Sequence, residues 1–194
     1  MILGWETHLK LVRLLEGLKA NEWTTSKGVK FITLGLQGIG GGRIVKTCMT
    51  SKHAGLTQEL AKVPDLWKAY FQDDSFTWST AQIVMNKTAD KFGFRLDNIL
   101  GPALFCSLGA YSGGEMMVED TTLGRLEIPT LSNIVMANGL EPRSVKPYKI
   151  EVNCSRFEII FCQLQSSFNL PPDDAAWMSV LPYGMSNYSI LNFF

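Results

Sequence analysis

The chain has 194 residues, of which 46% are hydrophobic and 19% charged, and its 18 basic and 18 acidic residues cancel to a net charge of zero. This length suffices for a domain with its own hydrophobic core, and the composition excludes a disordered or fibrous protein. Binding to nucleic acid phosphates needs clustered Lys and Arg, so we do not expect a nucleic-acid partner. These residues are spread singly here, and the densest run, three within residues 143–149, is expected to be a solvated loop. Only two histidines, His8 and His53, occur in the sequence, which argues against any mechanism that needs several imidazoles.

The four cysteines are far apart and lack the Cys-x-x-Cys spacing of zinc or redox sites, which predicts small buried side chains in a reducing compartment. They are Cys48, Cys106, Cys154 and Cys162. No apolar run reaches the 18 residues typical of a transmembrane helix, and charged residues after Met1 interrupt any signal peptide. The sequence therefore predicts an intracellular protein without a transmembrane segment, in an organelle that remains open.

The first part of the chain predicts a helix and a hairpin. Residues 6–20 carry leucines at positions 11, 14, 15 and 18, one apolar stripe of an amphipathic helix. Residues 29–36 alternate like a strand, and residues 43–49 resume the pattern after a glycine cluster, as in a hairpin. A phosphate-cradling loop is the alternative for these glycines, but no P-loop or Rossmann spacing follows, so a flexible turn is favoured.

A second helix is predicted over residues 56–71, with a break or a new first turn at Pro64. One face of this helix is apolar, and we expect its aromatic side chains to pack in the core or in a groove. The residues on that face are Leu56, Leu60, Val63, Trp67 and Tyr70.

From residue 76 onward the pattern changes to period two, in short strands separated by turn residues. Such a series favours a β-sandwich or jelly roll over a parallel α/β sheet. A last helix is expected near residues 173–181, after Pro171-Pro172. Without a linker or a repeat, we expect one domain, with helical and hairpin support in 1–74, a jelly-roll core in 75–164, and a helix and tail in 165–194. The predicted strands cover residues 76–85, 103–108, 115–118, 123–128, 133–137, 148–152 and 156–164.

Three motifs stand out in the middle of the chain: Ser75 to Lys87, Asp97 to Pro102, and Leu-Gly-Ala-Tyr-Ser-Gly-Gly-Glu at 108–115. They resemble motifs of the TET/JBP-like dioxygenases that depend on 2-oxoglutarate and Fe(II), in particular their divergent forms in algae, fungi and protists. Downstream, Ser155-Arg-Phe-Glu-Ile-Ile-Phe161 resembles the family's Gly-x-Arg-Tyr-Ser-Ile-Val-Phe strand. The resemblance spans roughly residues 29–185 and implies a mainly β fold with flanking helices, the double-stranded β-helix or jelly roll.

The resemblance also implies where an iron site would lie, and the sequence departs from it there. The family's His-x-Asp falls on Phe94 and Leu96, and its distal histidine falls on Lys146, Pro147 or Tyr148. A facial triad needs two imidazoles and one carboxylate, so no iron is expected. Asp97, one residue from the expected carboxylate, would still lack partner imidazoles, and we expect surface or structural roles for both histidines.

Arg156 matches the arginine with which the family clamps the distal carboxylate of 2-oxoglutarate. Two interpretations remain open for it. Arg156 is a candidate 2-oxoglutarate clamp, or it forms an ion pair with a nearby acid such as Glu158 or Glu115. The ion pair is favoured because the cofactor loses half of its contacts without iron.

The sequence thus predicts a pseudoenzyme that serves as a binding or structural subunit of a larger protein assembly. Its apolar C-terminal residues are candidates for binding a protein partner, with packing on their own domain as the alternative. The alternative function is an active dioxygenase that hydroxylates a nucleic-acid base or a protein side chain through a misaligned iron site. A non-iron enzyme that uses the same cavity is a third class, without an identifiable nucleophile. The candidate partner-binding residues are Tyr188, Ile190, Leu191, Phe193 and Phe194.

Overall fold

The computed structural model describes residues 1–26, 29–39, 43–85, 101–120, 122–138 and 143–163. In this part of the chain the main element is a seven-stranded antiparallel sheet, with β3 pairing β2 outside the order β1-β2-β4-β12-β5-β9. Its strands are β1 (Thr24–Ser26), β2 (Val29–Ile39), β3 (Arg43–Lys46), β4 (Thr80–Met85), β5 (Pro102–Gly109), β9 (Val135–Asn138) and β12 (Arg156–Cys162).

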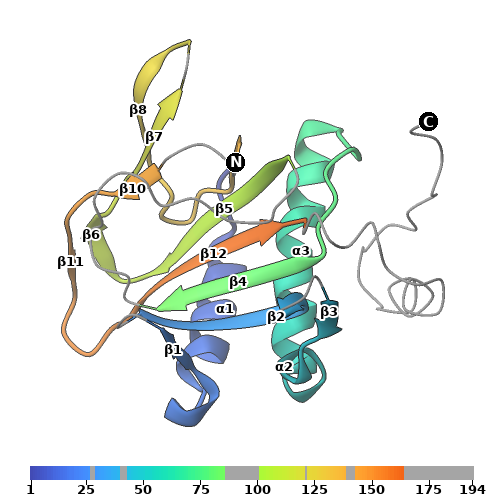
Figure 1. Ribbon diagram of the computed structural model, residues 1–194. Helices are drawn as coiled ribbons and strands as arrows, with labels where there is room; N and C mark the ends of the chain where they lie inside the picture. The colour runs from blue at the N-terminus through green and yellow to red at the C-terminus, as the bar shows by residue number, and fades with distance from the viewer. Residues whose placement is uncertain (27–28, 40–42, 86–100, 121, 139–142, 164–194) are drawn as a thin grey trace, which may run out of the picture.

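The shorter strands form a second wall of the jelly roll, on the side away from the helices (Figure 1). One group has the order β10-β7-β8, and β11 pairs with β6. The β7-β8 hairpin projects from the body of the molecule (Figure 1). These strands are β6 (Tyr111–Gly113), β7 (Met116–Asp120), β8 (Gly124–Ile128), β10 (Arg143–Val145) and β11 (Tyr148–Ile150).

Helices cover the opposite face of the main sheet (Figure 1). They are α1 (Trp5–Glu16), the 3₁₀ turn η1 (Ala20–Glu22), the short α2 (Cys48–Lys52) and α3 (Ala54–Phe71). Leu11 and Leu15 of α1 and Leu60 of α3 are buried in one core cluster with Ile83 and Phe157 of the sheet. The amphipathic stripe predicted in the first helix therefore packs as expected, with Leu14 and Leu18 at the margin of the same core.

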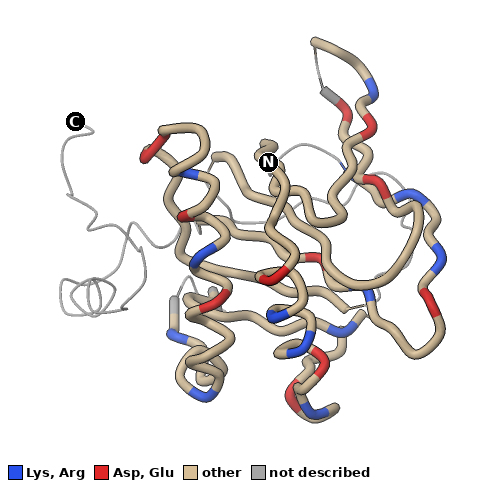
Figure 2. The backbone as a smooth tube through the Cα atoms, turned by 180° about the vertical axis from the view of Figure 1, so that it is seen from behind, with Lys and Arg blue, Asp and Glu red and all other residues tan. Residues whose placement is uncertain are grey.

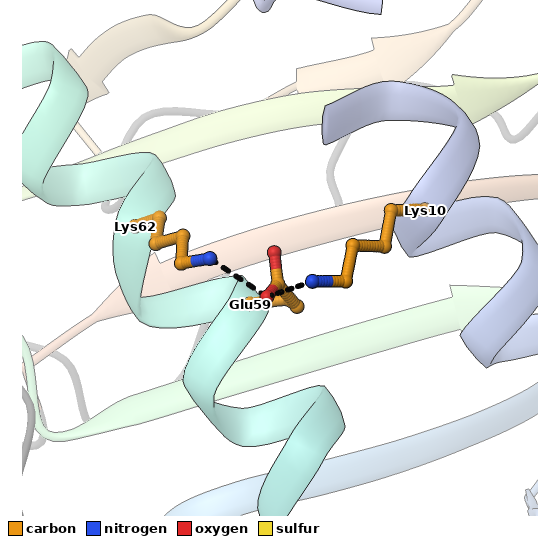
Figure 3. Close-up of polar contacts among 3 residues, drawn as sticks. All are labelled: Lys10, Glu59 and Lys62. Carbon is orange, nitrogen blue, oxygen red and sulfur yellow. Dashed lines mark hydrogen bonds and ion pairs between the residues drawn. The ribbon is translucent and has the colours of Figure 1, made fainter. Parts of the chain in front are cut away.

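An ion-pair network joins the two long helices (Figure 3). The Glu59 carboxylate of α3 accepts hydrogen bonds from Lys10 Nζ of α1 at 2.5 Å and from Lys62 Nζ at 2.7 Å. Elsewhere Lys and Arg are interspersed with Asp and Glu along the described backbone (Figure 2). No helix in the described ranges is long and apolar enough to cross a membrane.

The predicted hairpin and strands are present, but α1 ends at Glu16 rather than at residue 20, and β4 begins at Thr80 rather than at residue 76. Three further details of the prediction are wrong. The strand after the glycines ends at Lys46, and Cys48–Lys52 forms α2 instead. Helix α3 continues through Pro64, which is itself buried between Leu60 and Trp67 on the packed face. Tyr70 is 67% exposed, because Trp67 packs on Phe76 on the inner side of the last turn and Tyr70 packs against Phe71.

Two of the cysteine expectations also differ from the structure. Cys106 and Cys162 are buried, whereas Cys48 is exposed and Cys154 is half-buried. Cys48 begins the short helix α2, which lies at the surface, and Cys154 lies in the turn before β12. The prediction of buried side chains is therefore wrong for these two cysteines.

Candidate functional site

The interior of the jelly roll is built by the alternation of side chains along β12. Phe157, Ile159 and Phe161 point to the helices and belong to their core. Ile160 and Cys162 point to the interior and pack with Met116 and Val118 of β7, and Arg156 and Glu158 share this face by period two. One strand therefore serves both faces of the main sheet.

Arg156 is the largest side chain among the most deeply buried described residues, with 1% exposure. Its Nη2 donates hydrogen bonds to Ser107 Oγ at 3.2 Å and to the Gly114 carbonyl at 3.5 Å. Ser107 in turn donates to Thr130 Oγ1 at 3.0 Å. This network fixes the guanidinium to β5 and to the segment between β6 and β7.

Two tyrosine rings enclose the same guanidinium. The Arg156 Cζ atom lies 5.1 Å from the ring centroid of Tyr111 and 4.8 Å from that of Tyr148. The two rings meet edge to face, with centroids 5.9 Å apart. Cation-π contacts of this kind stabilise a charge that burial removes from water. Burial also raises the pKa of Tyr111, so its hydroxyl stays protonated.

The glycines of the motif at residues 108–115 make room for this cage. Gly109 ends β5 with a φ of +118°, and a Cβ atom there would lie 2.0 Å from the Ser155 carbonyl oxygen. A Cβ atom on Gly114 would lie 3.3 Å from Arg156 Nε and 3.1 Å from the Tyr148 Cβ. The part of the sequence with the most specific resemblance thus forms the wall around Arg156.

Two further charges lie in the interior, and one of them contradicts an expectation. The Glu158 carboxylate, 4% exposed, has its Oε2 3.8 Å from Arg156 Nη1. Residues 143–149 were expected to form a solvated loop, but Arg143 in β10 is only 3% exposed. Its guanidinium lies 4.7 Å above the Phe105 ring, because pairing of β10 with β7 turns the side chain inward.

Burial lowers the pKa of Arg143, and attraction to Glu158 acts in the opposite direction. Since arginine stays charged in proteins, the interior holds guanidinium groups from both walls, Arg143 from one and Arg156 from the other, around the Glu158 carboxylate. Charges are buried at a cost of several kcal/mol each, so such a group of three marks a candidate site rather than ordinary core.

The structure places only some of the residues that the resemblance singled out. Tyr148, at an expected metal-ligand position, packs on Arg156. Its neighbour Lys146 forms an ion pair with Glu127, and the Pro147 carbonyl accepts a hydrogen bond from Gly114 N. The other expected ligand positions, Phe94 and Leu96, lie outside the described residues. So do the predicted last helix and the candidate partner-binding residues 188, 190, 191, 193 and 194.

Both histidines of the sequence lie on the helical side of the molecule. His8 of α1 is buried, with its Nδ1 2.7 Å from Ser132 Oγ, and its Nε2 accepts a hydrogen bond from Gly109 N at 3.5 Å. His53 lies between α2 and α3, with its Nε2 3.2 Å from Glu22 Oε1. Both therefore lie outside the jelly-roll strands.

The groups around Arg156 do not fit ferrous iron. A triad for this metal needs two imidazoles and a carboxylate, whereas the described side chains here are guanidinium groups, tyrosine rings, hydroxyls and one carboxylate that already faces Arg156. Within the described ranges, no group of three or more His, Cys, Asp or Glu side chains is placed to hold a metal ion. The Arg156 guanidinium fits one carboxylate of 2-oxoglutarate in charge and shape, but Glu158 competes for it.

No protein-family model matches the sequence, and no curated protein is significantly similar to it. Solved structures with a similar fold are found at low sequence identity. A 2OG-Fe(II) oxygenase family oxidoreductase from Burkholderia pseudomallei has a TM-score of 0.54 and 12% identity, over 83% of this chain and 79% of that chain. NgTET1, solved in complex with 5mC DNA, has a TM-score of 0.61 and 11% identity, over 85% of this chain and 70% of that chain.

A prolyl hydroxylase from Trichoplax adhaerens, solved with a peptide of hypoxia inducible factor, has a TM-score of 0.51 and 12% identity, over 84% of this chain and 78% of that chain. At such identities the likeness shows the fold. Together with the antiparallel sheets and the helices on one face, it confirms the expected fold class. The chain has the jelly-roll fold of the 2OG-Fe(II) oxygenases.

Proposed function

We propose that this protein is a non-catalytic, divergent TET/JBP-like member of the dioxygenase fold that serves as a binding or structural subunit of a larger protein assembly. The observation that carries this proposal is the position of His8 and His53, the two imidazoles of the sequence. Each has a partner of its own on the helical side, so neither is available for a metal inside the jelly roll.

The chemistry at Arg156 supports the same proposal. In a metal centre, open coordination positions must be left for the oxidant and the substrate. Here two tyrosine rings pack against the guanidinium, and the Glu158 carboxylate of the same strand lies 3.8 Å from it. An interior filled in this way serves to hold the two walls of the jelly roll together.

The partner surface in this proposal is the apolar C-terminal segment, residues 187–194. Deleting it is expected to weaken assembly without unfolding the domain, since these residues follow the last strand among the described residues by more than twenty positions. The deletion and the full chain are compared by circular dichroism and by pull-down with the same partner. Equal pull-down by both proteins would contradict this part of the proposal.

Metal analysis together with a turnover assay tests the non-catalytic role. The protein purified from iron-supplemented cells is expected to contain far less than one iron per chain. It is also expected to release no succinate from 2-oxoglutarate, with or without added nucleic acid or peptide. Stoichiometric iron with succinate release would instead establish the active dioxygenase. His8→Gln and His53→Gln serve as variants, because loss of iron in either would identify an unrecognised ligand.

A further inference from the structure

We propose that Glu158 is a built-in carboxylate that keeps Arg156 closed to external carboxylates, so that the residue at position 158 determines whether the jelly roll binds a dicarboxylic acid. The inference deepens the proposed function and rests on it in one respect. A non-catalytic protein needs no ligand in this interior, and its own side chain can take the ligand's place.

The geometry places the carboxylate where a ligand would have to bind. Arg156 and Glu158 lie two residues apart on one strand and therefore face the same side of the sheet. The Glu158 Oε2 atom is 3.8 Å from Arg156 Nη1, and both side chains are almost completely buried. The Nη2 atom, on the other branch of the guanidinium, donates to Ser107 Oγ and the Gly114 carbonyl. The branch that carries Nη1 is the one that faces Glu158.

Arg143, on the other wall, also favours a negative charge at the position of Glu158. This buried guanidinium lies over Phe105, and Phe105 pairs in register with Ile160, the next interior residue of β12 after Glu158. Electrostatic attraction between Arg143 and Glu158 follows from this arrangement. A carboxylate in this position therefore faces guanidinium groups from both walls, Arg143 of β10 and Arg156 of β12.

Glutamate is chemically suited to replace such a ligand. Its side chain is a carboxylate on two methylene groups, which is also one end of glutarate or of 2-oxoglutarate. Because it is tethered to β12, its local concentration near Arg156 exceeds that of a free acid. An external dicarboxylate must displace it and leave it buried without its arginine, which is costly.

The sequence departs from the related motif at this position. In the strand motif that Ser155 to Phe161 resembles, the residue two positions after the arginine is serine, and here it is Glu158. A serine there carries no charge, and its shorter side chain frees the space of the glutamate carboxylate beside Arg156. Glu158→Ser is therefore the variant that separates the two states of the site.

The experiment measures binding of 2-oxoglutarate and of glutarate to the full chain by isothermal titration calorimetry. The wild type is expected to bind neither acid measurably. Glu158→Ser is expected to bind both acids at least about tenfold more tightly than the weakest affinity that the titration of the wild type could have detected. Added Arg156→Met in the same chain is expected to abolish the gain, because the acid then has no guanidinium. Glutarate has no oxo group, so its binding reports the carboxylate clamp alone.

Ile160→Ala is the matched control. It opens a cavity on the same strand and the same face but leaves the carboxylate of Glu158 in place, and it is expected to bind neither acid. Binding by Ile160→Ala as tight as by Glu158→Ser would show that free volume, rather than the carboxylate, controls access. Equal binding by the wild type and Glu158→Ser would overturn the proposal in the same way.

A folding measurement covers the case in which Glu158→Ser is unstable. The acids are then expected to raise the melting temperature of Glu158→Ser and to leave that of the wild type unchanged. A variant that neither binds nor gains stability, while folded Glu158→Gln also binds none, would overturn the proposal. These outcomes are independent of iron content and succinate release, which test the non-catalytic role.

Discussion

Different interactions stabilise the two faces of the main sheet. The face under α1 and α3 is a continuous apolar core in which Phe157, Ile159 and Phe161 of β12 pack against leucines of the helices. The face inside the jelly roll carries Arg156 and Glu158 from the same strand and Arg143 from the opposite wall. Apolar burial is favourable wherever it occurs, whereas buried charges are stable only as a matched group.

This difference sets the interior apart from an ordinary apolar core. A hydrophobic interior of the same volume would stabilise the jelly roll at least as well as a buried ion pair does. Keeping Arg156, with glycines and tyrosines shaped around it, therefore needs a reason beyond stability. The proposed reason is descent from a site that bound a carboxylate, which Glu158 now occupies.

The largest effect is expected when one member of the interior pair is removed. Arg156→Met should lower the free energy of unfolding by about 3–5 kcal/mol, because Glu158 is left buried without its charge partner. The double variant Arg156→Met, Glu158→Met should be more stable than the single one, since it removes both charges. Urea unfolding followed by tryptophan fluorescence measures both. Additive losses in the double variant would mean that the two charges do not interact.

The two faces can also be compared by truncating adjacent residues of β12. Ile159→Ala, on the helical face, and Ile160→Ala, on the interior face, should each lower the free energy of unfolding by roughly 2–5 kcal/mol. We expect the larger loss for Ile159, because its cavity is enclosed by the larger core cluster. Urea unfolding of both variants decides this, and a larger loss for Ile160 would show that the interior is the better packed face.

The strand pattern could be predicted from the sequence because alternation and turn residues are local signals. The strands that were missed, β1, β6 and β10, each have only three residues, too few to show a period. Arg143 was assigned to a solvated loop for the same reason. Its burial depends on pairing with Val118 and on contact with Phe105, which lie 25 and 38 positions away.

For the candidate site, the sequence predicted the arginine and left its partner open. Arg156 was found through a motif, and Glu158 and Glu115 were both named as acids that could pair with it. The structure places Glu158 beside Arg156, as the two-residue spacing on a strand implies. The roles of Ser107, Tyr111 and Gly114 could not be predicted, since they depend on how β5, β6 and β12 are arranged in space.

His8 is a buried polar group on the helical side, and its effect should depend on pH. Burial lowers its pKa, so the folded protein favours the neutral ring, which accepts a hydrogen bond from Gly109 N. Stability from this group is therefore present above the unfolded pKa of about 6.5 and is lost as the pH falls through the lower folded value. One proton limits the slope to about 1.4 kcal/mol per pH unit.

The comparison for His8 is the free energy of unfolding between neutral pH and pH about 5. His8→Gln should be less stable at neutral pH and should show a flatter pH dependence than the wild type. His53→Gln is the control, because His53 lies between α2 and α3, away from Gly109 and Ser132, and its side chain is 19% exposed. A slope that persists unchanged in His8→Gln would show that His8 is not its source.

The smallest effect is expected for the charges that lie outside both faces. Lys10 and Lys62 lower the pKa of Glu59 by hydrogen bonding (Figure 3), so this contribution is present above the unfolded pKa of Glu59 and is lost as the pH falls through the lower folded value. Both lysines are more than half exposed, and Glu59→Gln should therefore cost only about 0.2–1 kcal/mol.

Salt separates this surface network from the interior pair. In about 1 M NaCl the loss caused by Glu59→Gln should nearly vanish, because the screening length falls to about 3 Å. The loss caused by Arg156→Met should persist, since water and ions do not reach a side chain that is 1% exposed. Urea unfolding of both variants at low and high salt measures the contrast. Equal sensitivity of the two losses to salt would mean that water and ions reach Arg156 and Glu158 in the interior.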